Sequence, residues 1–477
     1  GDDGYSADSA AFGNPLLDYG KVAPRPSAEL EEAPEMTETK TTEEQYRAYL
    51  AHPETLPVTF TYGGAAYRGF PAESFTLTDT RSDVSDLVEE NDLTFVLRDT
   101  SLEICVETAW YPQHKAYEWT VYFVNRGLTE TKRIADLNAA DLYFYGTNAT
   151  LSGTSGDYGG NYQPYTEKIK SKTITKQNKS GRPTHNAFPY FQLDFGGKEG
   201  VFFALGWPGN WKSSFAPCTV NGAPGAVHCV AGQYSVDTTL LPGETLRSPL
   251  ASFVFYEGDG DAATNAWRRW YIDCNMPKEE NGDPRKPILT ASTSWLYACM
   301  TTATESNQIA AIKEWLDNGI PLDYWWMDAG WYLGAGDKTI TALDQSGNWK
   351  VDASRFPTEF KAISDYAKEN GMTGTILWFE PELFRLSVEQ IMATNPDYKA
   401  EWVLGNLAHN GKLNDFSNPE MVDWITEIVV NILKKGGVTV YRQDFNESPG
   451  DVWLSHDTEG RTGITENKYV QGYLGYW

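Results

Sequence analysis

Acidic side chains follow several apolar segments in the second half of the sequence. The runs LDYWWM, TGTILWF and VTVY each read as a buried strand, and carboxylates follow within a few residues, at Asp328, Glu380, Glu382 and Asp444, with Asp415 in the segment NDFS. Carboxylates that crowd into one cleft cost free energy unless they pair with a cation or bind a ligand. We therefore interpret these side chains as parts of one site.

Indole rings accompany these carboxylates, at Trp295, Trp325, Trp326, Trp331 and Trp378. Flat rings stack on sugar faces, carboxylates accept hydrogen bonds from sugar hydroxyls, and negative charge stabilises an oxocarbenium-like transition state. The combination favours a carbohydrate ligand. Mg²⁺ or Ca²⁺ held by carboxylates is the alternative, because both ions prefer oxygen ligands. No histidine stands in these motifs, and we expect no metal and no cofactor.

Asp444 has the strongest chemical context of the group. It follows the strand VTVY, stands two residues after Arg442, and precedes Asn446, which could hold a sugar hydroxyl. A neighbouring guanidinium keeps a carboxylate ionised and nucleophilic. Asp444 is therefore the predicted nucleophile. The other residues keep simpler alternatives: Asp328 as a loop cap, Glu380 or Glu382 as a partner of Arg385, and Arg442 as an ion-pair partner only.

The segments that must position these side chains alternate between strand and helix over residues 288–477. Such alternation predicts a parallel sheet with helical crossovers. A doubly wound sheet and a (β/α)8 barrel both fit, but functional groups at successive strand ends are typical of a barrel, and no Gly-rich phosphate loop follows the first strand. About four strand–helix units fit before Trp477. We expect the missing half of the barrel to come from downstream sequence or another chain.

The sequence before this part is rich in predicted strands. Short aromatic and β-branched segments bounded by Gly, Asn and Pro predict a large antiparallel sandwich over residues 47–260. The predicted strands are 93–99, 102–111, 117–126, 190–197, 200–207 and 248–256. Residues 1–46 read as an extended N-terminal arm, and residues 261–287 as a helical linker that ends in PKEENGDPRKP.

Composition limits the partners and the compartment. The net charge of −26 disfavours nucleic acid and anionic membranes, and no run of 18 apolar residues exists to span a bilayer. Cys218 and Cys229 flank a short loop and could form a disulfide, but the five cysteines leave at least one thiol free. We expect a secreted, cell-surface or periplasmic protein.

At its motifs the chain resembles glycoside hydrolase family 36, the melibiase-type α-galactosidases. Residues 327–331 (MDAGW) are similar to the family's Asp-Asp-Gly-Trp, and residues 378–382 (WFEPE) match its Trp-x-Glu-Pro-Glu. Residues 442–446 (RQDFN) are similar to Lys-Trp-Asp-x-Asn, in which the Asp is the nucleophile. Residues 181–185 (GRPTH) look like a Gly-Arg-Ser-Ser-His loop that reaches toward the barrel, which adds His185 to the expected substrate contacts.

The resemblance implies an N-terminal β-supersandwich followed by a (β/α)8 catalytic barrel, of which the chain holds about the first half. It implies a retaining α-galactosidase-like hydrolase that acts by double displacement from Asp444. The expected substrate contacts are Asp328, Trp331, Trp295, Trp378, Glu380, Arg442, Asn446 and His185. The family's acid/base is an Asp that lies further along the chain than Trp477, and the family's assemblies suggest a homo-oligomer.

Two departures from the family pattern affect the expected specificity. Ala329 replaces the second of the paired aspartates, which hold the sugar's 4-OH and 6-OH in the family, and Arg442 replaces a lysine. Arg and Lys differ in shape and in hydrogen bonding. An α-N-acetylgalactosaminidase or α-galactosaminidase of the same clan is therefore the alternative enzyme, and a non-catalytic carbohydrate-binding relative is the alternative from another class.

Overall fold

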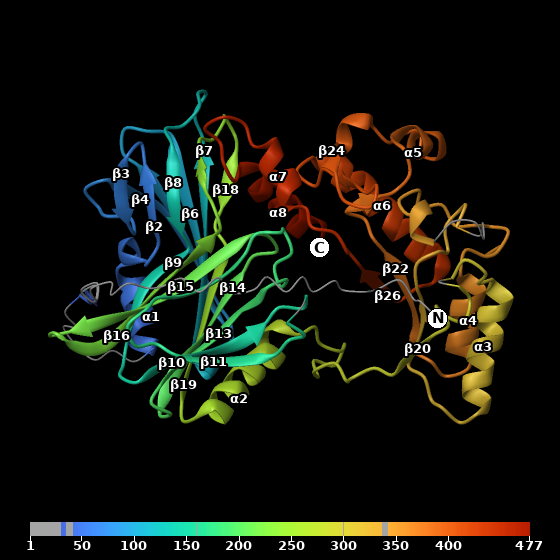
Figure 1. The fold of residues 1–477 in the computed structure, drawn as a ribbon, viewed down its shortest axis with the longest axis horizontal. Coiled ribbons are helices and arrows are strands. Elements are labelled where there is room, and N and C mark those ends of the chain that lie inside the picture. The colour runs from blue at the N-terminus through green and yellow to red at the C-terminus, as the bar shows by residue number, and fades with distance from the viewer. Residues whose placement is uncertain (1–29, 35–41, 159, 299, 336–341) are drawn as a thin grey trace, which may run out of the picture.

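The chain folds into two regions that differ in how their strands pair (Figure 1). The computed structural model describes residues 30–34, 42–158, 160–298, 300–335 and 342–477. Residues 30–257 form the β region, whose strands pair mainly in antiparallel. Residues 260–287 lead to the α/β region, residues 288–477, which contains a parallel sheet and most of the helices. Most of the predicted arm, residues 1–46, lies outside the described residues.

The largest sheet of the β region has the strand order β11-β10-β13-β14-β19-β7-β6-β5-β4, with β18 paired to β7. Its strands are β4 (Phe75–Val84), β5 (Glu89–Leu97), β6 (Leu102–Tyr111), β7 (Ala116–Asn125), β10 (Ala149–Ser155), β11 (Pro164–Lys168), β13 (Ala187–Phe195), β14 (Glu199–Gly206), β18 (Thr245–Arg247) and β19 (Leu250–Glu257). All six segments predicted as strands overlap one of these strands.

Two smaller sheets complete the β region. One has the order β1-β15-β16-β9, with β12 paired to β15, and the other has the order β17-β8-β2-β3. The strands of the first are β1 (Glu31–Glu32), β9 (Ala140–Tyr145), β12 (Ile174–Asn178), β15 (Trp211–Val220) and β16 (Ala223–Gln233). Those of the second are β2 (Thr59–Tyr62), β3 (Ala65–Arg68), β8 (Ile134–Asn138) and β17 (Asp237–Thr238).

Alternation of side chains explains how these sheets enclose a core. In β13, for example, every second residue from Ala187 to Phe195 is buried, and the residues between them are more exposed. Successive side chains of a strand point to opposite faces, so one face of the sheet is apolar. Stacked rings fill the space behind it, such as Trp119 and Phe253 with centroids 4.9 Å apart.

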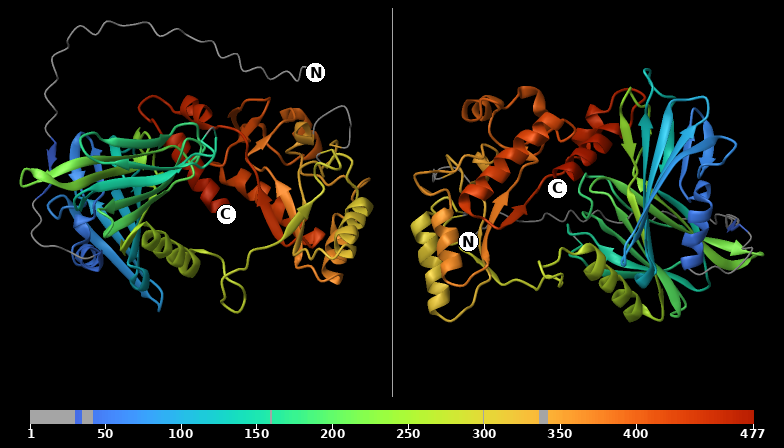
Figure 2. Two further views of the ribbon diagram at one scale, coloured as in Figure 1. Left: turned by 60° about the horizontal axis from the view of Figure 1, so that its bottom comes forward. Right: turned by 180° about the vertical axis from the view of Figure 1, so that it is seen from behind.

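The predicted linker forms helix α2 (Gly260–Trp270), which continues into a π-helical turn at Tyr271–Asn275. Asp259 caps this helix, because its side chain accepts hydrogen bonds from the backbone N–H groups of Asp261 and Ala262. A satisfied N-cap fixes where a helix begins. The chain then crosses to the α/β region along an extended path (Figure 2).

The parallel sheet of the α/β region has the order β20-β21-β22-β26. Its strands are β20 (Thr290–Ser292), β21 (Tyr324–Met327), β22 (Gly374–Phe379) and β26 (Val440–Gln443). Helices α3 (Glu305–Asp317), α4 (Lys361–Glu369) and α6 (Pro419–Gly436) connect them. Helix α6 ends in two lysines and a glycine and has Gly437 at φ +62° as its C-cap, a conformation that glycine adopts easily.

An insertion between β22 and α6 carries helix α5 (Val388–Thr394) and a small antiparallel sheet of β23 (Leu383–Phe384), β24 (Val403–Asn406) and β25 (Lys412–Asn414). The remaining elements are α1 (Thr42–Ala51), α7 (Gly450–His456), α8 (Ile464–Tyr476) and single 3₁₀ turns at Pro53–Thr55, Pro112–His114, Ala342–Gln345 and Ala400–Trp402. Among the described residues, no helix combines the length and the apolar character that crossing a membrane requires.

Helices α7 and α8 lie between the two regions (Figures 1 and 2). The buried carboxylate of Glu466 in α8 accepts hydrogen bonds from Trp207 Nε1 at 2.8 Å, from Asn210 N at 2.6 Å and from Asn210 Nδ2 at 2.8 Å. Burial raises the pKa of Glu466 to about 7 in spite of these donors. Ile464 and Val470 of the same helix pack into the core of the β region. Helix α8 thus joins the two regions.

The described cysteines are all free, at Cys105, Cys218, Cys229 and Cys274. Cys218 and Cys229 lie on neighbouring strands, but their cross-strand partners are Ala226 and Phe215. The disulfide considered from the sequence therefore does not form, because the two thiols are out of register. Cys299 lies outside the described residues.

Candidate active site

The parallel sheet brings the ends of β22 and β26 side by side. Trp378 pairs with Arg442, Phe379 pairs with Gln443, and the backbone N–H of Asp444 donates to the carbonyl of Phe379 at 2.8 Å. Glu380 and Asp444 are the residues that directly follow these two strands. Since carboxyl ends of parallel strands meet at one edge of a sheet, the two carboxylates predicted from separate motifs are neighbours.

Asp444 is held by an indole and a guanidinium. Its Oδ2 accepts a hydrogen bond from Trp378 Nε1 at 3.1 Å, and Arg442 Nη1 forms an ion pair with the same oxygen at 3.0 Å. The Arg442 guanidinium also lies over the ring of Trp326, 5.0 Å from its centroid. Burial alone would raise the pKa of Asp444, but the Trp378 hydrogen bond and the Arg442 charge hold it below its ordinary value. Asp444 is therefore ionised at neutral pH.

Glu380 lies fully buried beside Asp444 and shares a cation with Glu447. Arg385 Nη1 is 3.0 Å from Glu380 Oε2, and Arg385 Nη2 is 3.3 Å from Glu447 Oε1. The backbone N–H of Asn446 donates to Glu380 Oε1 at 3.4 Å. Burial raises the pKa of Glu380 to about 7, with Arg385 opposing the rise and the charge of Asp444 adding to it. The pKa of Asp444 is thus lowered, whereas the pKa of the neighbouring Glu380 is raised.

Glu382, two residues after Glu380, makes a polar contact with helix α8. It accepts hydrogen bonds from Tyr469 Oη at 2.9 Å and from Gln443 Nε2 at 3.1 Å. Burial raises the pKa of Glu382 to about 7 despite both donors. Glu382 therefore ties the end of β22 to β26 and to α8.

The tryptophans predicted to contact substrate occupy different environments. Trp331 is fully buried, donates from Nε1 to the carbonyl of Trp378 at 2.9 Å, and packs against Phe379. Trp378 is also buried, although its Nε1 reaches Asp444. Trp295 lies beyond the end of β20 and is 88% exposed. The structure brings Trp378 to Asp444, places Trp331 in the core behind it and leaves Trp295 at the surface.

Two of the strand-end aspartates have local roles in the backbone. Asp328 is half-buried at the end of β21, and its Oδ1 accepts from the N–H of Ala329 at 2.8 Å. Asp415 Oδ1 accepts from the N–H and the hydroxyl of Ser417, at 2.9 and 2.6 Å, just before helix α6. Asp415 therefore stabilises a turn, as short acidic side chains commonly do.

The loop at residues 180–185 of the β region touches the segment that follows Asp444. The N–H of Gly450 donates to the carbonyl of Ser180 at 3.0 Å, and a Cβ on Gly181 would lie 2.6 Å from the nitrogen of Gly450. Only glycine fits such a close backbone approach. His185 stacks on Tyr158 with centroids 4.6 Å apart, and its Nδ1 lies 3.7 Å from Asp157. The loop reaches the α/β region, whereas the contacts of His185 are within the β region.

Three members of this network were not predicted from the sequence. Glu447 is buried and bridges Arg385 and His409, whose Nδ1 lies 3.2 Å from Glu447 Oε1. His409 comes from the turn between β24 and β25, and Tyr469 comes from α8. Glu447 stands three residues after Asp444, which is a signal that could have found it. His409 and Tyr469 reach the network only through tertiary folding.

The arrangement suits nucleophilic and proton-transfer chemistry. Asp444 is an ionised carboxylate at the edge of the sheet, and Glu380 beside it can hold or release a proton near neutral pH. Environments that separate the pKa values of neighbouring carboxyls assign them different roles. Within the described ranges, no three His, Cys, Asp or Glu side chains are grouped in a way that could hold a metal ion.

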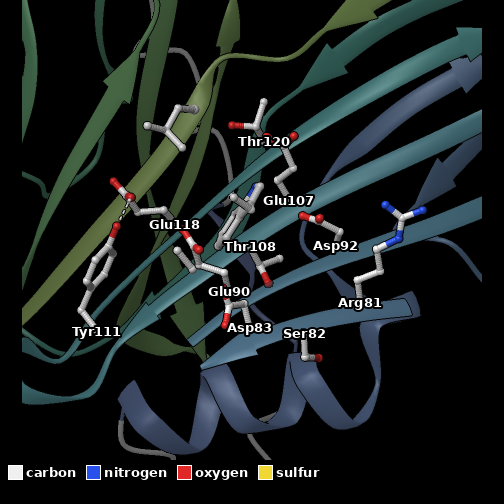
Figure 3. Close-up of a pocket in the computed structure, with 13 residues that line it drawn as sticks. Arg81, Ser82, Asp83, Glu90, Asp92, Glu107, Thr108, Tyr111, Glu118 and Thr120 are labelled. Atoms are coloured by element: carbon white, nitrogen blue, oxygen red, sulfur yellow. Dashed lines mark hydrogen bonds between the residues drawn. The ribbon is translucent and has the colours of Figure 1, made fainter. Parts of the chain in front are cut away.

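A second acidic feature lies on the largest sheet of the β region (Figure 3). It is a pocket of about 460 Å³ whose walls include Asp83, Glu90, Asp92, Glu107 and Glu118. Of these, Glu118 is held by Tyr111 Oη at 3.1 Å and by Ser252 Oγ at 2.6 Å. None of the predicted site residues lines this pocket.

Comparison with known families and curated proteins finds relatives of this chain. The model of the Melibiase family matches residues 248–474. Alpha-galactosidase Mel36A of Lactobacillus acidophilus is 25% identical over 304 residues, which are 61% of this chain and 39% of the relative. A probable alpha-galactosidase C of Aspergillus flavus is 24% identical over 451 residues, which are 90% of this chain and 54% of the relative. The chain thus spans about half or less of these relatives.

Solved structures share the fold. The GH36 alpha-galactosidase AgaB of Geobacillus stearothermophilus superposes with a TM-score of 0.68 at 17% identity, covering 88% of this chain and 58% of AgaB. The galactosidase domain of the alpha-galactosidase–sucrose kinase AgaSK gives a TM-score of 0.65 at 16% identity, covering 88% of this chain and 57% of that domain. An overlap of 88% of the chain is large enough to include parts of both the β region and the α/β region.

Proposed function

We propose that the protein is a retaining, α-galactosidase-like glycosidase, because residues 248–474 match the model of the Melibiase family. The substrate would be a terminal α-linked galactose-type sugar on a glycan or an oligosaccharide. The curated relatives named as α-galactosidases support this assignment. We include in the proposal the expected absence of a cofactor.

The observation that carries the proposal is the environment of Asp444. A nucleophilic carboxylate must be ionised and must stay in place while the sugar reacts. Trp378 Nε1 and Arg442 Nη1 converge on Asp444 Oδ2 and lower its pKa. The backbone bond to Phe379 fixes the residue to β22. This strand-end carboxylate therefore combines a held position with an ionised state.

The reaction would proceed by double displacement at the anomeric carbon. Asp444 attacks that carbon, the bond to the leaving oxygen breaks, and an acid supplies the proton for that oxygen. Water then attacks the glycosyl–enzyme ester, the same group accepts the proton of the water, and Asp444 is released. We propose that this acid/base is a group other than Glu380, since Arg385 and the backbone N–H of Asn446 already engage that carboxylate.

The same proposal covers the architecture. The strands β20, β21, β22 and β26 would be half of a (β/α)8 barrel, completed by polypeptide outside these residues, and the β region would be a β-supersandwich. Besides Asp444, we propose Asp328, Trp295, Arg442 and Asn446 of the α/β region and His185 of the β region as substrate contacts. We further propose a secreted, cell-surface or periplasmic location and assembly into a homo-oligomer.

Turnover of nitrophenyl α-glycosides by the full-length gene product tests the assignment. We expect hydrolysis of the α-galactoside and its loss, by at least about a thousandfold, in Asp444→Asn, because no carboxylate is left to form the ester. Asp415→Asn is the matched control, since Asp415 stabilises a turn before α6, and it should keep most of the activity. Unchanged turnover in Asp444→Asn would refute Asp444 as the nucleophile. Sugar binding with no turnover in the unmodified protein would point to a binding relative.

One observation favours a second candidate substrate, an α-linked N-acetylgalactosamine or galactosamine. Residue 329, directly after Asp328, is a buried alanine, so its side chain offers no hydrogen bond to a sugar. The Arg442 guanidinium is fixed between Asp444 and Trp326. The assay panel should therefore include both amino-sugar glycosides. Turnover of these without turnover of the galactoside would replace the first candidate by the second.

A further inference from the structure

A short acidic strand is added to one edge of the β region. Strand β1 pairs in parallel with β15, with Glu31 opposite Cys218 and Glu32 opposite Thr219, and the N–H of Ala33 donates to the carbonyl of Thr219 at 2.8 Å. Ala33 is buried in a small cluster with Cys218 and Ala226. Addition of an extended segment to a sheet edge is a recurring mode of peptide recognition, in which main-chain bonds give affinity and side-chain contacts give selectivity.

The side-chain contacts of this strand centre on His228 of β16. Its Nδ1 lies 3.0 Å from Glu31 Oε2, and its Nε2 lies 2.8 Å from Asp141 Oδ1. The Tyr143 ring stacks on the imidazole with centroids 4.3 Å apart, and Tyr143 Oη donates to Glu31. Glu31 therefore enters a cradle made by an imidazole and a phenol.

This geometry fixes the protonation state of His228. A carboxylate only accepts hydrogen bonds, whereas a neutral imidazole has one donor nitrogen and one acceptor nitrogen. Both ring nitrogens of His228 face carboxylate oxygens, so both must donate, and the ring must be the cation. A neutral ring would turn a lone pair toward Glu31 or toward Asp141. The contact between β1 and the sheet thus requires a proton on His228.

The charged and titratable groups around His228 agree with this assignment. Glu31 from β1 and Asp141 from β9 are its anions, Arg68 from β3 pairs with Asp141 at 3.0 Å, and Tyr143 and Cys218 complete the surroundings. Burial lowers the pKa of His228, but the bonds to Asp141 and Glu31 outweigh it and leave the pKa above 6.5. While the imidazole is charged, the two carboxylates of Glu31 and Asp141 are balanced by two cations, His228 and Arg68.

We propose that this edge, formed by β15 with Tyr143 and His228, is a docking surface for an acidic extended segment that is released when His228 loses its proton. Residues 31–33 of the same chain occupy the surface in this structure. The docking free energy linked to His228 is fully present below the pH at which an unfolded histidine titrates. It is lost as the pH rises through the higher pKa of the docked state.

Cys218 offers a reporter that belongs to the chain itself. It is 1% exposed beneath β1 and shares its cluster with Ala33, so departure of the strand uncovers the thiol. The experiment measures the rate of iodoacetamide labelling of Cys218 by peptide mass spectrometry between pH 6 and 9. Each rate is divided by that of the urea-unfolded chain at the same pH, which removes the intrinsic pH dependence of the thiol. Cys229, fully buried in the main core, reports global unfolding.

Release linked to one proton should raise the normalised rate by up to about tenfold per pH unit between the pKa of a free histidine and the higher pKa of docked His228, and the rate should level off above that range. His228→Gln should give a high rate with no pH dependence. Glu31→Gln should give a low rate with no pH dependence, because a neutral imidazole can donate to Asp141 and accept from the amide. Glu32→Gln, which changes a residue that contacts Thr219 and Gly222, should raise the rate without moving the midpoint.

A pH-independent rate in the unmodified chain, or a Glu31→Gln profile identical to it, would overturn the proposal. Labelling of Cys229 together with Cys218 would also overturn it, since the strand would then leave only when the β region unfolds. The rates should be equal at two protein concentrations. Protection that grows with concentration would reject residues 31–33 of the same chain as the occupant in favour of a second copy.

Discussion

Two parts of the molecule collect carboxylates, and they do so under different conditions. The pocket on the largest sheet of the β region has Asp83, Glu90, Asp92 and Glu107 exposed at its walls (Figure 3). At the ends of β22 and β26, Glu380, Glu382 and Glu447 are buried. Water screens the charges of the pocket, but it is excluded from the carboxylates at the strand ends. The same residue type is therefore a solvated surface in one region and a set of interdependent charges in the other.

The difference shows that burial with specific donors, rather than the number of acids, marks the candidate active site. In the pocket, Glu118 is half-buried, unlike the exposed acids, and it accepts hydrogen bonds from Tyr111 and Ser252. Each buried carboxylate at the strand ends is held by a guanidinium, a phenol or an indole from another element. Buried charges without such partners would not be tolerated.

Removal of a cation should separate the two regions most clearly. Arg385→Met leaves Glu380 and Glu447 buried without their shared guanidinium, and we expect it to cost about 3–5 kcal/mol of unfolding free energy. Arg81→Met, in the pocket, removes a cation whose partner Asp79 is half exposed. It should change stability by less than about 0.5 kcal/mol. Urea unfolding of the two variants measures both values, and similar losses would contradict the distinction.

The second-largest effect should be a pH dependence of stability that comes from the buried carboxylates at the strand ends. The pKa of Glu382 is about 7 in the folded chain and 4.5 as its ordinary value, so the native state binds more protons between these pH values. Stability contributed by Glu382 therefore falls as the pH rises from about 4.5 to above 7, by up to about 3 kcal/mol. Glu382→Gln should remove this component. The free energy of unfolding of the parent minus that of Glu382→Gln should fall by this amount between pH 5 and pH 8.

Loss of one phenol should have a smaller effect that also depends on pH. Tyr469→Phe removes the donor to Glu382 Oε2 while leaving the ring in place. A hydrogen bond to a charged group contributes about 1.5–3 kcal/mol. Because the donor serves the ionised carboxylate, the cost should be larger at pH 8 than at pH 5. Thermal unfolding at both pH values checks this, and an equal cost would mean that Glu382 stays protonated.

The smallest effect should come from the exposed acids. Asp92→Asn in the pocket should shift the free energy of unfolding by no more than about 0.5 kcal/mol at any pH from 5 to 8. The reason is that water solvates both the carboxylate and the amide. A loss above 1 kcal/mol in the same urea titration would show that this pocket, too, depends on a specific charge.

Local sequence patterns predicted much of the fold. Alternating strands such as β13, the capped helix α6 with its terminal Gly437, and the change from antiparallel strands to strand–helix units all follow from short-range spacing. That Cys218 and Cys229 do not form a disulfide was not predictable in this way, because it depends on strand register. Register is set by the whole sheet, and a shift by one residue would move every side chain to the opposite face.

The candidate site divides in the same manner. The motifs placed Asp444, Glu380 and Arg442 at strand ends, and parallel pairing of β22 with β26 makes them neighbours. The motifs did not reveal that Trp331 would be buried behind Trp378 while Trp295 stays exposed, since indoles serve both as core and as surface. They also gave no sign of His409 or Tyr469, which come from elements distant in sequence.

By itself, the sequence determined the residue types, their order along the chain and the strands that carry them, because these depend on local periodicity. Only the tertiary structure decided which carboxylate keeps its charge. Arg442 and Trp378 lower the pKa of Asp444, whereas burial raises the pKa values of Glu380 and Glu382. Charge is a property of the environment of a side chain, and that environment is assembled from β22, β26, α8 and the loops between them.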